Sequence, residues 1–127
     1  MALRRAVPNV LFVVSSIERL PDALAGVADH VTIHFPWGSL LRGVTCGDDA
    51  VLAPLAGLVR AGGRIDLVLQ GDDAALAAFE RHGLALVERR VATAAEVART
   101  RSSWAKRLGI GPGRPAFVFR FARLRDR

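Results

Sequence analysis

The sequence predicts an α/β domain that is built on a largely parallel β-sheet. Short runs rich in Val and Ile, which are typical of strands, alternate along the chain with stretches that begin at helix-capping residues. The 127 residues are enough for one domain, residues 1–127, and no internal repeat or Ser/Gly-rich linker divides them. Because 51% of the residues are hydrophobic and 24% are charged, the composition is that of a globular protein and excludes a disordered chain.

Five segments are candidates for strands. Residues 9–14 (NVLFVV), 30–35 and 64–70 are short apolar runs, and the first is expected to be buried on both faces. Residues 115–123 (PAFVFRFAR) alternate in polarity and predict the last strand, whereas the shorter apolar stretch at residues 84–91 is a weaker candidate.

Helices are predicted between these strands from their capping residues. Asp48 and Asp72 are placed to cap helices, and Thr93 forms a capping box with Glu96 three residues later. Gly62, with the glycine after it, is expected to end the helix that begins at Asp48. The predicted helical segments are residues 21–28, 39–44, 48–59 and 72–82, and one that begins at residue 93.

Positive charge is concentrated in the last quarter of the chain. Residues 1–98 contain nine Arg against eleven Asp and Glu, whereas residues 99–127 contain eight Arg and one Lys against one Asp. A basic segment of this kind supplies the sequence-independent part of nucleic-acid binding, so residues 99–127 are expected to contact RNA. The alternative is that the charge serves solubility, but this does not explain why it is segregated along the chain.

The composition also indicates where the protein works. The longest apolar run, residues 10–14, is far shorter than the roughly 20 residues that cross a bilayer, so no membrane partner is expected. The first residues lack the pattern of a secretory signal, and the single cysteine fits a reducing cytoplasm. No cluster of His, Cys, Asp and Glu has metal-ligand spacing, so we expect no metal site.

The Gly-rich turn that holds a nucleotide cofactor is missing after the first predicted strand. That strand is followed by Ser-Ser-Ile-Glu at residues 15–18, and the Gly-rich stretch at residues 109–113 follows a predicted helix instead.

Two tryptophans stand in distinctive surroundings. Trp37 lies in a Phe-Pro-Trp-Gly-Ser turn directly after a predicted strand, and Trp104 lies within the basic segment beside Lys106 and Arg107. An aromatic ring among cations is suited to stacking on a nucleic-acid base, and two such rings could sandwich a base that has left its stack. The alternative for Trp37 is that it packs under a neighbouring helix as part of the core.

Three blocks of the sequence resemble one family of enzymes. Residues 10–21 (VLFVVSSIERLP), 35–44 (FPWGSLLRGV) and 103–108 (SWAKRL) are similar, in order and spacing, to the aminoglycoside-resistance 16S rRNA (adenine 1408-N1) methyltransferases. The resemblance implies the α/β fold of a class I, Rossmann-like methyltransferase that uses S-adenosylmethionine. This chain would form the C-terminal half of such a sheet and would lack the N-terminal half that holds most of the cofactor.

The resemblance also implies roles for single residues. The two residues that would stack on the target adenine are Trp37 and Trp104. The two hydroxyl residues that would lie near the methyl donor and the target are Ser39 and Ser103. The residues that would line the S-adenosylmethionine pocket are Ser16, Ile17, Glu18 and Ser39. The basic residues that would hold the rRNA are Lys106, Arg107 and Arg114.

The activity that the resemblance implies is methylation of N1 of adenine 1408 in 16S rRNA of the 30S subunit, which gives aminoglycoside resistance. Because the sequence begins just before the expected fourth strand of such an enzyme, we expect either a truncated chain, or a gene start that is placed too late, or a second chain that completes the enzyme. Residues 10–14 would then be an exposed edge strand that a second chain could complete. The alternatives are a non-catalytic RNA-binding remnant that docks on the small subunit, and a related methyltransferase that acts on another RNA.

Overall fold

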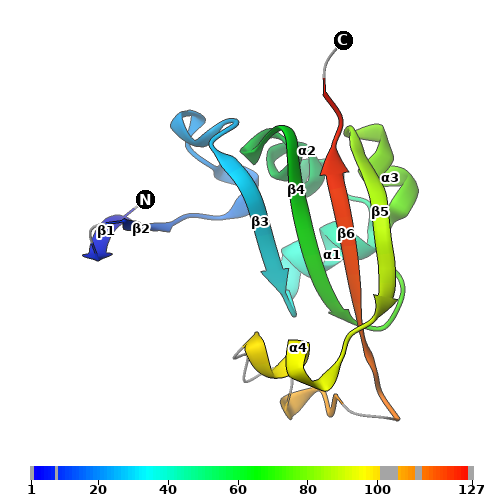
Figure 1. Cartoon of the computed structure of the whole chain (residues 1–127). Coiled ribbons are helices and arrows are strands. Elements are labelled where there is room, and N and C mark those ends of the chain that lie inside the picture. The colour runs from blue at the N-terminus through cyan, green and yellow to red at the C-terminus, as the bar shows by residue number, and fades with distance from the viewer. Residues whose placement is uncertain (1, 8, 101–105, 111–112, 126–127) are drawn as a thin grey trace.

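A four-stranded sheet forms the centre of the molecule (Figure 1). The computed structural model describes residues 2–7, 9–100, 106–110 and 113–125. The strands of the sheet, in the order β3-β4-β6-β5, have the bounds β3 (Ala28–His34), β4 (Val59–Gln70), β6 (Ala116–Arg123) and β5 (Leu84–Val91). All four fall on segments that the apolar pattern predicts as strands, and the α/β class is confirmed.

The sheet is mixed, so the prediction of a largely parallel sheet is wrong. β3 and β4 are parallel, with Thr32 opposite Asp66, whereas β6 runs antiparallel to both of its neighbours. The chain leaves β5 at the edge where β6 begins, and the connection through α4 (Ala94–Arg99) stays at that edge (Figure 1). Because the chain returns from the same edge, β5 and β6 are antiparallel.

Three helices lie against one face of the sheet (Figure 1). Their bounds are α1 (Gly38–Cys46), α2 (Asp49–Leu58) and α3 (Leu76–Arg81). Alternate residues of the central strands, such as Leu67 and Phe119, are fully buried in the main core on this side. Phe79 of α3 stacks on Phe121 of β6 with the ring centroids 4.0 Å apart. Each such ring contributes about 1.5–3 kcal/mol through burial, so this face holds most of the apolar stabilisation.

Two of the predicted helix starts are confirmed, whereas the predicted end at Gly62 is wrong. The Asp48 side chain accepts a hydrogen bond from the Ala50 amide, and Thr93 and Glu96 form the predicted capping box. Gly62, however, does not end a helix: α2 stops at Leu58, and Gly62 lies inside β4 with φ of 82°. The chain passes directly from α2 into β4, and β4 begins five residues before the apolar run at residues 64–70 that predicted it.

Two other predicted helices are reduced in the structure. Asp72 is not a helix cap, because its carboxylate pairs with Arg89 of β5, and α3 begins only after Ala75. The segment at residues 21–28 contains a single turn of 3₁₀ helix, Asp22–Leu24, before β3 begins. Among the described residues, no helix combines the length and the apolar character that crossing a membrane requires.

The strand at the N-terminal end lies apart from the main sheet. β2 (Val10–Val14) pairs antiparallel with β1 (Ala2–Val7), and this hairpin lies to one side of the central sheet (Figure 1). The prediction that residues 9–14 are buried on both faces is wrong, since Leu11, Phe12 and Val14 are exposed. The edge strand of the central sheet on that side is β3, not the segment at residues 10–14.

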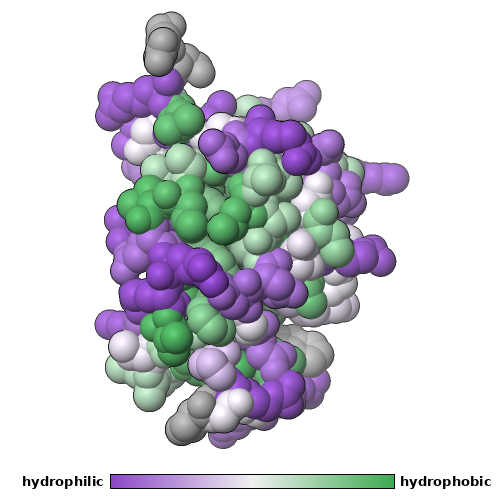
Figure 2. All heavy atoms as spheres, turned by 90° about the vertical axis from the view of Figure 1, so that its right-hand side faces the viewer, coloured by the Kyte–Doolittle hydropathy of each residue, from purple (hydrophilic) through white to green (hydrophobic). Residues whose placement is uncertain are grey.

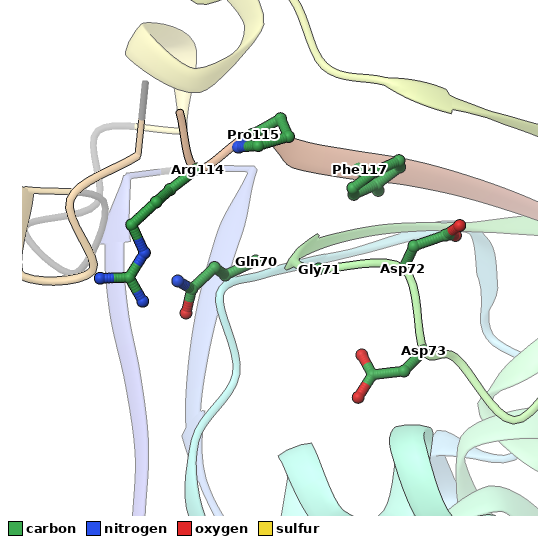
Figure 3. A pocket seen from close by; sticks show the side chains of 7 residues that line it. All are labelled: Gln70, Gly71, Asp72, Asp73, Arg114, Pro115 and Phe117. Carbon is green, nitrogen blue, oxygen red and sulfur yellow. The ribbon is translucent and has the colours of Figure 1, made fainter. Parts of the chain in front are cut away.

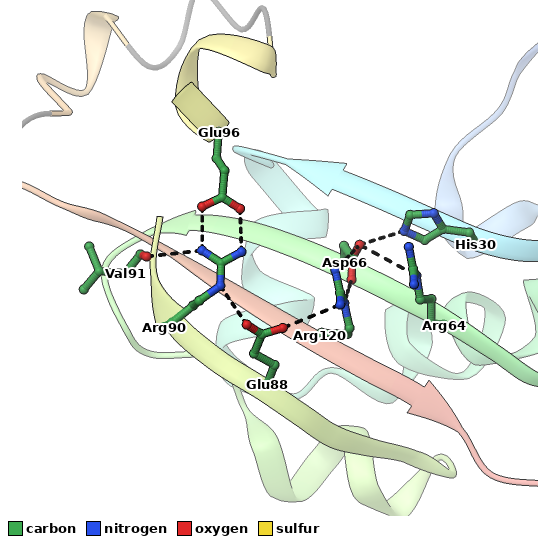
Figure 4. A network of polar contacts seen from close by, with 8 residues as sticks. All are labelled: His30, Arg64, Asp66, Glu88, Arg90, Val91, Glu96 and Arg120. Carbon is green, nitrogen blue, oxygen red and sulfur yellow. Dashed lines mark hydrogen bonds and ion pairs between the residues drawn. The ribbon is translucent and has the colours of Figure 1, made fainter. Parts of the chain in front are cut away.

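The second face of the sheet carries a small apolar cluster and a row of charged residues. The cluster, called here the strand-end cluster, consists of buried residues at the end of the strands that faces α4: Phe35, Val68, Ala116 and Val118. The row crosses the sheet beside it through direct strand partners, Asp66, Arg120 and Glu88 (Figure 4). The Arg120 Nε donates to Asp66 Oδ1 at 2.8 Å, and the Arg120 Nη1 lies 3.5 Å from Glu88 Oε2.

The β5 edge mixes apolar and charged side chains. Seen from that side, apolar atoms are bordered by hydrophilic ones (Figure 2). Leu86 and Val87 are exposed on β5, and a register shift separates Leu86 from Glu88, after which charged residues follow. Charges and a bulge at an edge strand oppose its pairing with another chain.

Candidate active site

Predicted site residues lie beyond the carboxyl ends of two strands. Glu18 follows β2, and Trp37 and Ser39 follow β3, whereas Gln70, which was not predicted, ends β4. Since β3 and β4 are parallel, their carboxyl ends meet at one edge of the sheet. In open α/β sheets, this edge is where ligands bind.

Glu18 and Ser39 are in direct contact, although 21 residues separate them. The Ser39 hydroxyl donates a hydrogen bond of 2.9 Å to Glu18 Oε1. Glu18 lies in a turn of 3₁₀ helix (Ile17–Arg19), and Ser39 is the second residue of α1. The structure therefore brings together two residues that the resemblance assigns to one cofactor pocket, and both are exposed to solvent.

The turn that carries Glu18 is anchored to the body of the protein. The Ile17 side chain is partly buried against the main core. This contact holds the turn in place, and little of the side chain is left to line a cofactor pocket. The backbone carbonyl of Ser16 accepts hydrogen bonds from the Arg19 amide, at 3.2 Å, and from the Ser15 hydroxyl, at 3.2 Å. Ser16 itself is exposed beside Glu18.

Trp37 points away from the core. It is 69% exposed and stands at the N-cap of α1 in an extended conformation. The alternative that Trp37 packs under a neighbouring helix is therefore wrong. The turn begins at Phe35, whose φ of 48° lies in the left-handed region, and whose side chain is only 3% exposed.

Two of the three predicted basic residues lie in one helical turn, and the third lines a shallow pocket. Lys106 and Arg107 are exposed, and the Lys106 carbonyl accepts a hydrogen bond from the Gly109 amide at 3.1 Å. Arg114 points toward Gln70 (Figure 3). When the side-chain amide of Gln70 is oriented with its oxygen toward Arg114, this oxygen accepts hydrogen bonds from the guanidinium. The predicted residues Trp104 and Ser103 lie outside the described residues.

The pocket next to Arg114 contains residues that the sequence did not single out. Besides Gln70, it is lined by Asp73 and by the ring of Phe117 (Figure 3). The available signal was their position, because Gln70 ends a predicted strand and Asp73 lies in the loop that follows it. Among the residues described, no group of His, Cys, Asp and Glu could hold a metal ion.

α4 precedes the segment at residues 101–105 and is fixed to the sheet by an ion pair. Both oxygens of Glu96 accept hydrogen bonds from Arg90 of β5, and Oε1 also accepts from the Thr93 amide (Figure 4). The hydrogen bonds from Arg90, followed by those from Thr93, lower the pKa of Glu96 from 4.5 to about 2. The carboxylate therefore stays ionised and keeps the start of α4 in one place.

A comparison with protein families identifies a matching family. The model of the NpmA family, described as 16S rRNA (adenine(1408)-N(1))-methyltransferase, matches residues 2–78. A protein of that name from Escherichia coli is 33% identical over 82 residues, which are 64% of this chain and 37% of the relative. Another from Streptoalloteichus hindustanus is 30% identical over 123 residues, covering 80% of this chain and 56% of the relative. The chain thus spans between about a third and a little over half of these relatives.

Solved structures agree with this match. The 16S rRNA (adenine(1408)-N(1))-methyltransferase from Catenulisporales acidiphilia, as a tryptophan-to-alanine mutant with cosubstrate SAM, aligns with a TM-score of 0.81 at 26% identity. The alignment covers 94% of this chain and 64% of that chain. The 16S rRNA methyltransferase KamB aligns with a TM-score of 0.78 at 25% identity, covering 93% and 64%. The predicted class of fold, part of a methyltransferase sheet, is confirmed.

Proposed function

Because the chain belongs to the family of 16S rRNA (adenine(1408)-N(1))-methyltransferases, we propose that it forms the RNA-recognising part of such an enzyme. The proposed reaction transfers a methyl group from S-adenosylmethionine to N1 of adenine 1408 in the 30S subunit and gives aminoglycoside resistance. The observation that carries the proposal is the contact between Ser39 and Glu18 beside the exposed ring of Trp37. A polar pair and an aromatic face thus stand next to one another at the ligand-binding edge of the sheet.

The chemistry matches what these side chains offer. Adenine N1 has a lone pair of its own, so methyl transfer to it needs no strong general base. When bound, S-adenosylmethionine supplies an activated methyl group on its sulfonium. The protein's task is to hold the acceptor nitrogen in line with that methyl group, and such positioning lowers a reaction barrier by several kcal/mol. This explains why no histidine is needed at the site.

In this proposal, the side chains of the site stack on the target base, hold the methyl donor and bind phosphates. Trp37 stacks on the adenine after it leaves its helix, together with Trp104 from the other side. Ser16, Ile17, Glu18 and Ser39 hold the donor, and Ser39 and Ser103 also face the target base. Lys106, Arg107 and Arg114 bind phosphates, for which exposed cations beyond the strand ends are suited.

A second polypeptide completes the sheet in this proposal. Among the described residues, β3 pairs with β4 on one side only, and the hairpin of β1 and β2 stands away from that open edge. β2 also exposes apolar residues, such as Phe12 and Val14, that a second polypeptide could cover. The relatives are longer than this chain, and we infer that the strands that complete the sheet correspond to the part of those relatives that this chain does not span.

The test measures donor binding and methyl transfer separately. Calorimetry would titrate S-adenosylmethionine into the 127-residue chain, alone and together with the N-terminal part of the Streptoalloteichus hindustanus relative supplied as a separate polypeptide. Labelled methyl transfer to 30S subunits would be followed in the same mixtures. We expect S-adenosylmethionine to bind, and methyl groups to be transferred, only when the second polypeptide is present. If the chain binds 30S subunits but never supports transfer with any added part, the non-catalytic RNA-binding alternative holds instead.

A further inference from the structure

Phe35 has an unusual backbone for its residue type. Among the described residues, it is the single residue other than glycine with a positive φ, at 48°. Bulky side chains avoid this region because the Cβ atom crowds the carbonyl oxygen. Such strain persists only where the surrounding structure holds it in place, and it is found most often at functional sites.

Two contacts hold Phe35 in this conformation. Its amide donates a hydrogen bond of 2.9 Å to the carbonyl of Val68 at the end of the neighbouring strand. Its side chain is buried in the strand-end cluster with Val68, Ala116 and Val118. Burial of the ring on the second face of the sheet therefore offsets the backbone strain.

The bend at Phe35 determines where the next residues go. Directly after it, Pro36 and Trp37 leave the sheet, and α1 begins at Gly38. As a result, the Trp37 ring is exposed, while Ser39 faces Glu18. The direction of this turn therefore depends on the ring of Phe35, which is buried in the strand-end cluster.

The same cluster also packs against the turn at residues 106–110. Leu108 and Ile110 are partly buried against it, and Val97 of α4 joins them. Leu108 lies two residues after Lys106, so the phosphate-binding turn and the Trp37 turn share one apolar support. Packed clusters transmit displacements between the elements they join because they contain few voids.

We propose that Phe35 is a positioning residue that fixes Trp37 relative to the turn at residues 106–110 through the strand-end cluster. The proposal rests on the proposed function only for what the two elements bind, because the mechanical link is a property of the cluster itself. A base stacked on Trp37 and the phosphates beside it require a fixed separation. The buried ring of Phe35 maintains that separation.

The test replaces Phe35 by Gly and, separately, by Leu. Glycine adopts a positive φ without strain, so F35G keeps the bend and removes only the anchoring ring. Leucine keeps an apolar anchor. The matched control is Phe119→Leu, which changes a buried ring of the main core on the other face of the sheet. Leu108→Ala removes support from the other side of the strand-end cluster.

The readouts are the mobility of Trp37 and the affinity for 30S subunits. In a Trp104→Phe background, Trp37 is the sole tryptophan, so fluorescence anisotropy decay reports its motion alone. We expect F35G to make this motion faster and to weaken 30S binding on the order of tenfold. L108A should weaken binding similarly, F35L should fall between F35G and the parent, and F119L should change only thermal stability.

Two outcomes would overturn the proposal. One is unchanged Trp37 motion and unchanged 30S affinity in folded F35G and F35L. The other is an equal effect of F119L on both readouts, which would show that any loss of stability has the same result. If the parent chain does not bind 30S subunits, the proposed function fails, whereas the Trp37 measurement still decides whether Phe35 acts as the anchor.

Discussion

Glu96 accepts hydrogen bonds from Arg90 Nη1 and Nη2, at 2.5 Å each, and thereby joins α4 to the edge strand of the sheet. The same carboxylate closes the capping box at the start of its own helix, where Thr93 is the partner. α4 has only six residues and contains no fully buried side chain. A helix this short is not stable by itself in water, so its position depends on this ion pair and on the contact of Val97 with the strand-end cluster.

Replacing Glu96 by Gln should lower the free energy of unfolding by about 1.5–3 kcal/mol, because a charge-assisted pair and a cap weaken together. Since the folded-state pKa of about 2 lies below the ordinary value of 4.5, this contribution is present above pH 4.5 and is lost as the pH falls toward 2. Urea unfolding across this pH range checks both statements. Glu80→Gln on the exposed side of α3 is the control, and equal pH profiles for E96Q and the parent would refute the assignment.

Asp66 should be more sensitive to substitution than other paired aspartates. Burial raises the pKa of Asp66, but the hydrogen bonds from Arg120 and His30 lower it more, so the net direction is down. We expect Asp66→Asn to cost about 1–3 kcal/mol of stability, because its side chain is only 16% exposed. Asp29→Asn, in an exposed pair with Arg60, should cost at most about 1 kcal/mol. Thermal unfolding of both variants measures these losses of stability. Equal losses in the two variants would contradict the role of burial at Asp66.

Trp37 should matter for RNA binding and not for stability. Because the ring is 69% exposed, Trp37→Ala should change the free energy of unfolding by no more than about 0.5 kcal/mol. Loss of one base-stacking platform should weaken binding to a labelled decoding-site RNA by about 1–3 kcal/mol. Denaturation followed by circular dichroism and an anisotropy titration measure the two effects. Trp37→Phe should recover part of the affinity, and full affinity of the alanine variant would exclude stacking.

Lys106 and Arg107 should contribute to RNA affinity in a salt-dependent way. Changing both to Glu should weaken 30S binding at low salt, and each lost phosphate contact should reduce the slope of log affinity against log salt by about 1. Arg60→Glu, at the opposite end of β4 from Gln70, controls for the loss of positive charge in general. An equal decrease in the control would mean that net charge, and not this turn, attracts the RNA.

Local features of the fold could be predicted from sequence, whereas long-range ones could not. The strands at residues 30–35 and 64–70 are recognisable because burial on both faces requires nearly continuous apolar runs, and the strand at residues 115–123 is recognisable by its alternating polarity. Asp48 was recognisable as a cap because its side chain acts on an amide two residues away. The antiparallel direction of β6 depends on the path of a connection, and no local pattern encodes that path.

The same distinction applies to the candidate site. Trp37 and the basic residues attract attention by their type, and the resemblance pointed to Glu18 and Ser39. The hydrogen bond between those two residues and the positive φ of Phe35 are known only from the fold. The sequence predicts Phe35 as the end of a strand, since an apolar residue carries no sign that its backbone is bent.

The place of β6 has a consequence for how this protein is made. β6 follows β4 and β5 in the sequence, yet it lies between them in the sheet, and Asp66 and Arg120 pair across 54 residues of sequence. During synthesis, β4 and β5 therefore remain without the strand that lies between them, and the sheet closes only after residue 123 has left the ribosome. Contacts this distant in sequence slow folding. A premature stop shortly before residue 116 would remove the middle of the sheet and not its margin, so early release of the chain would leave no foldable core.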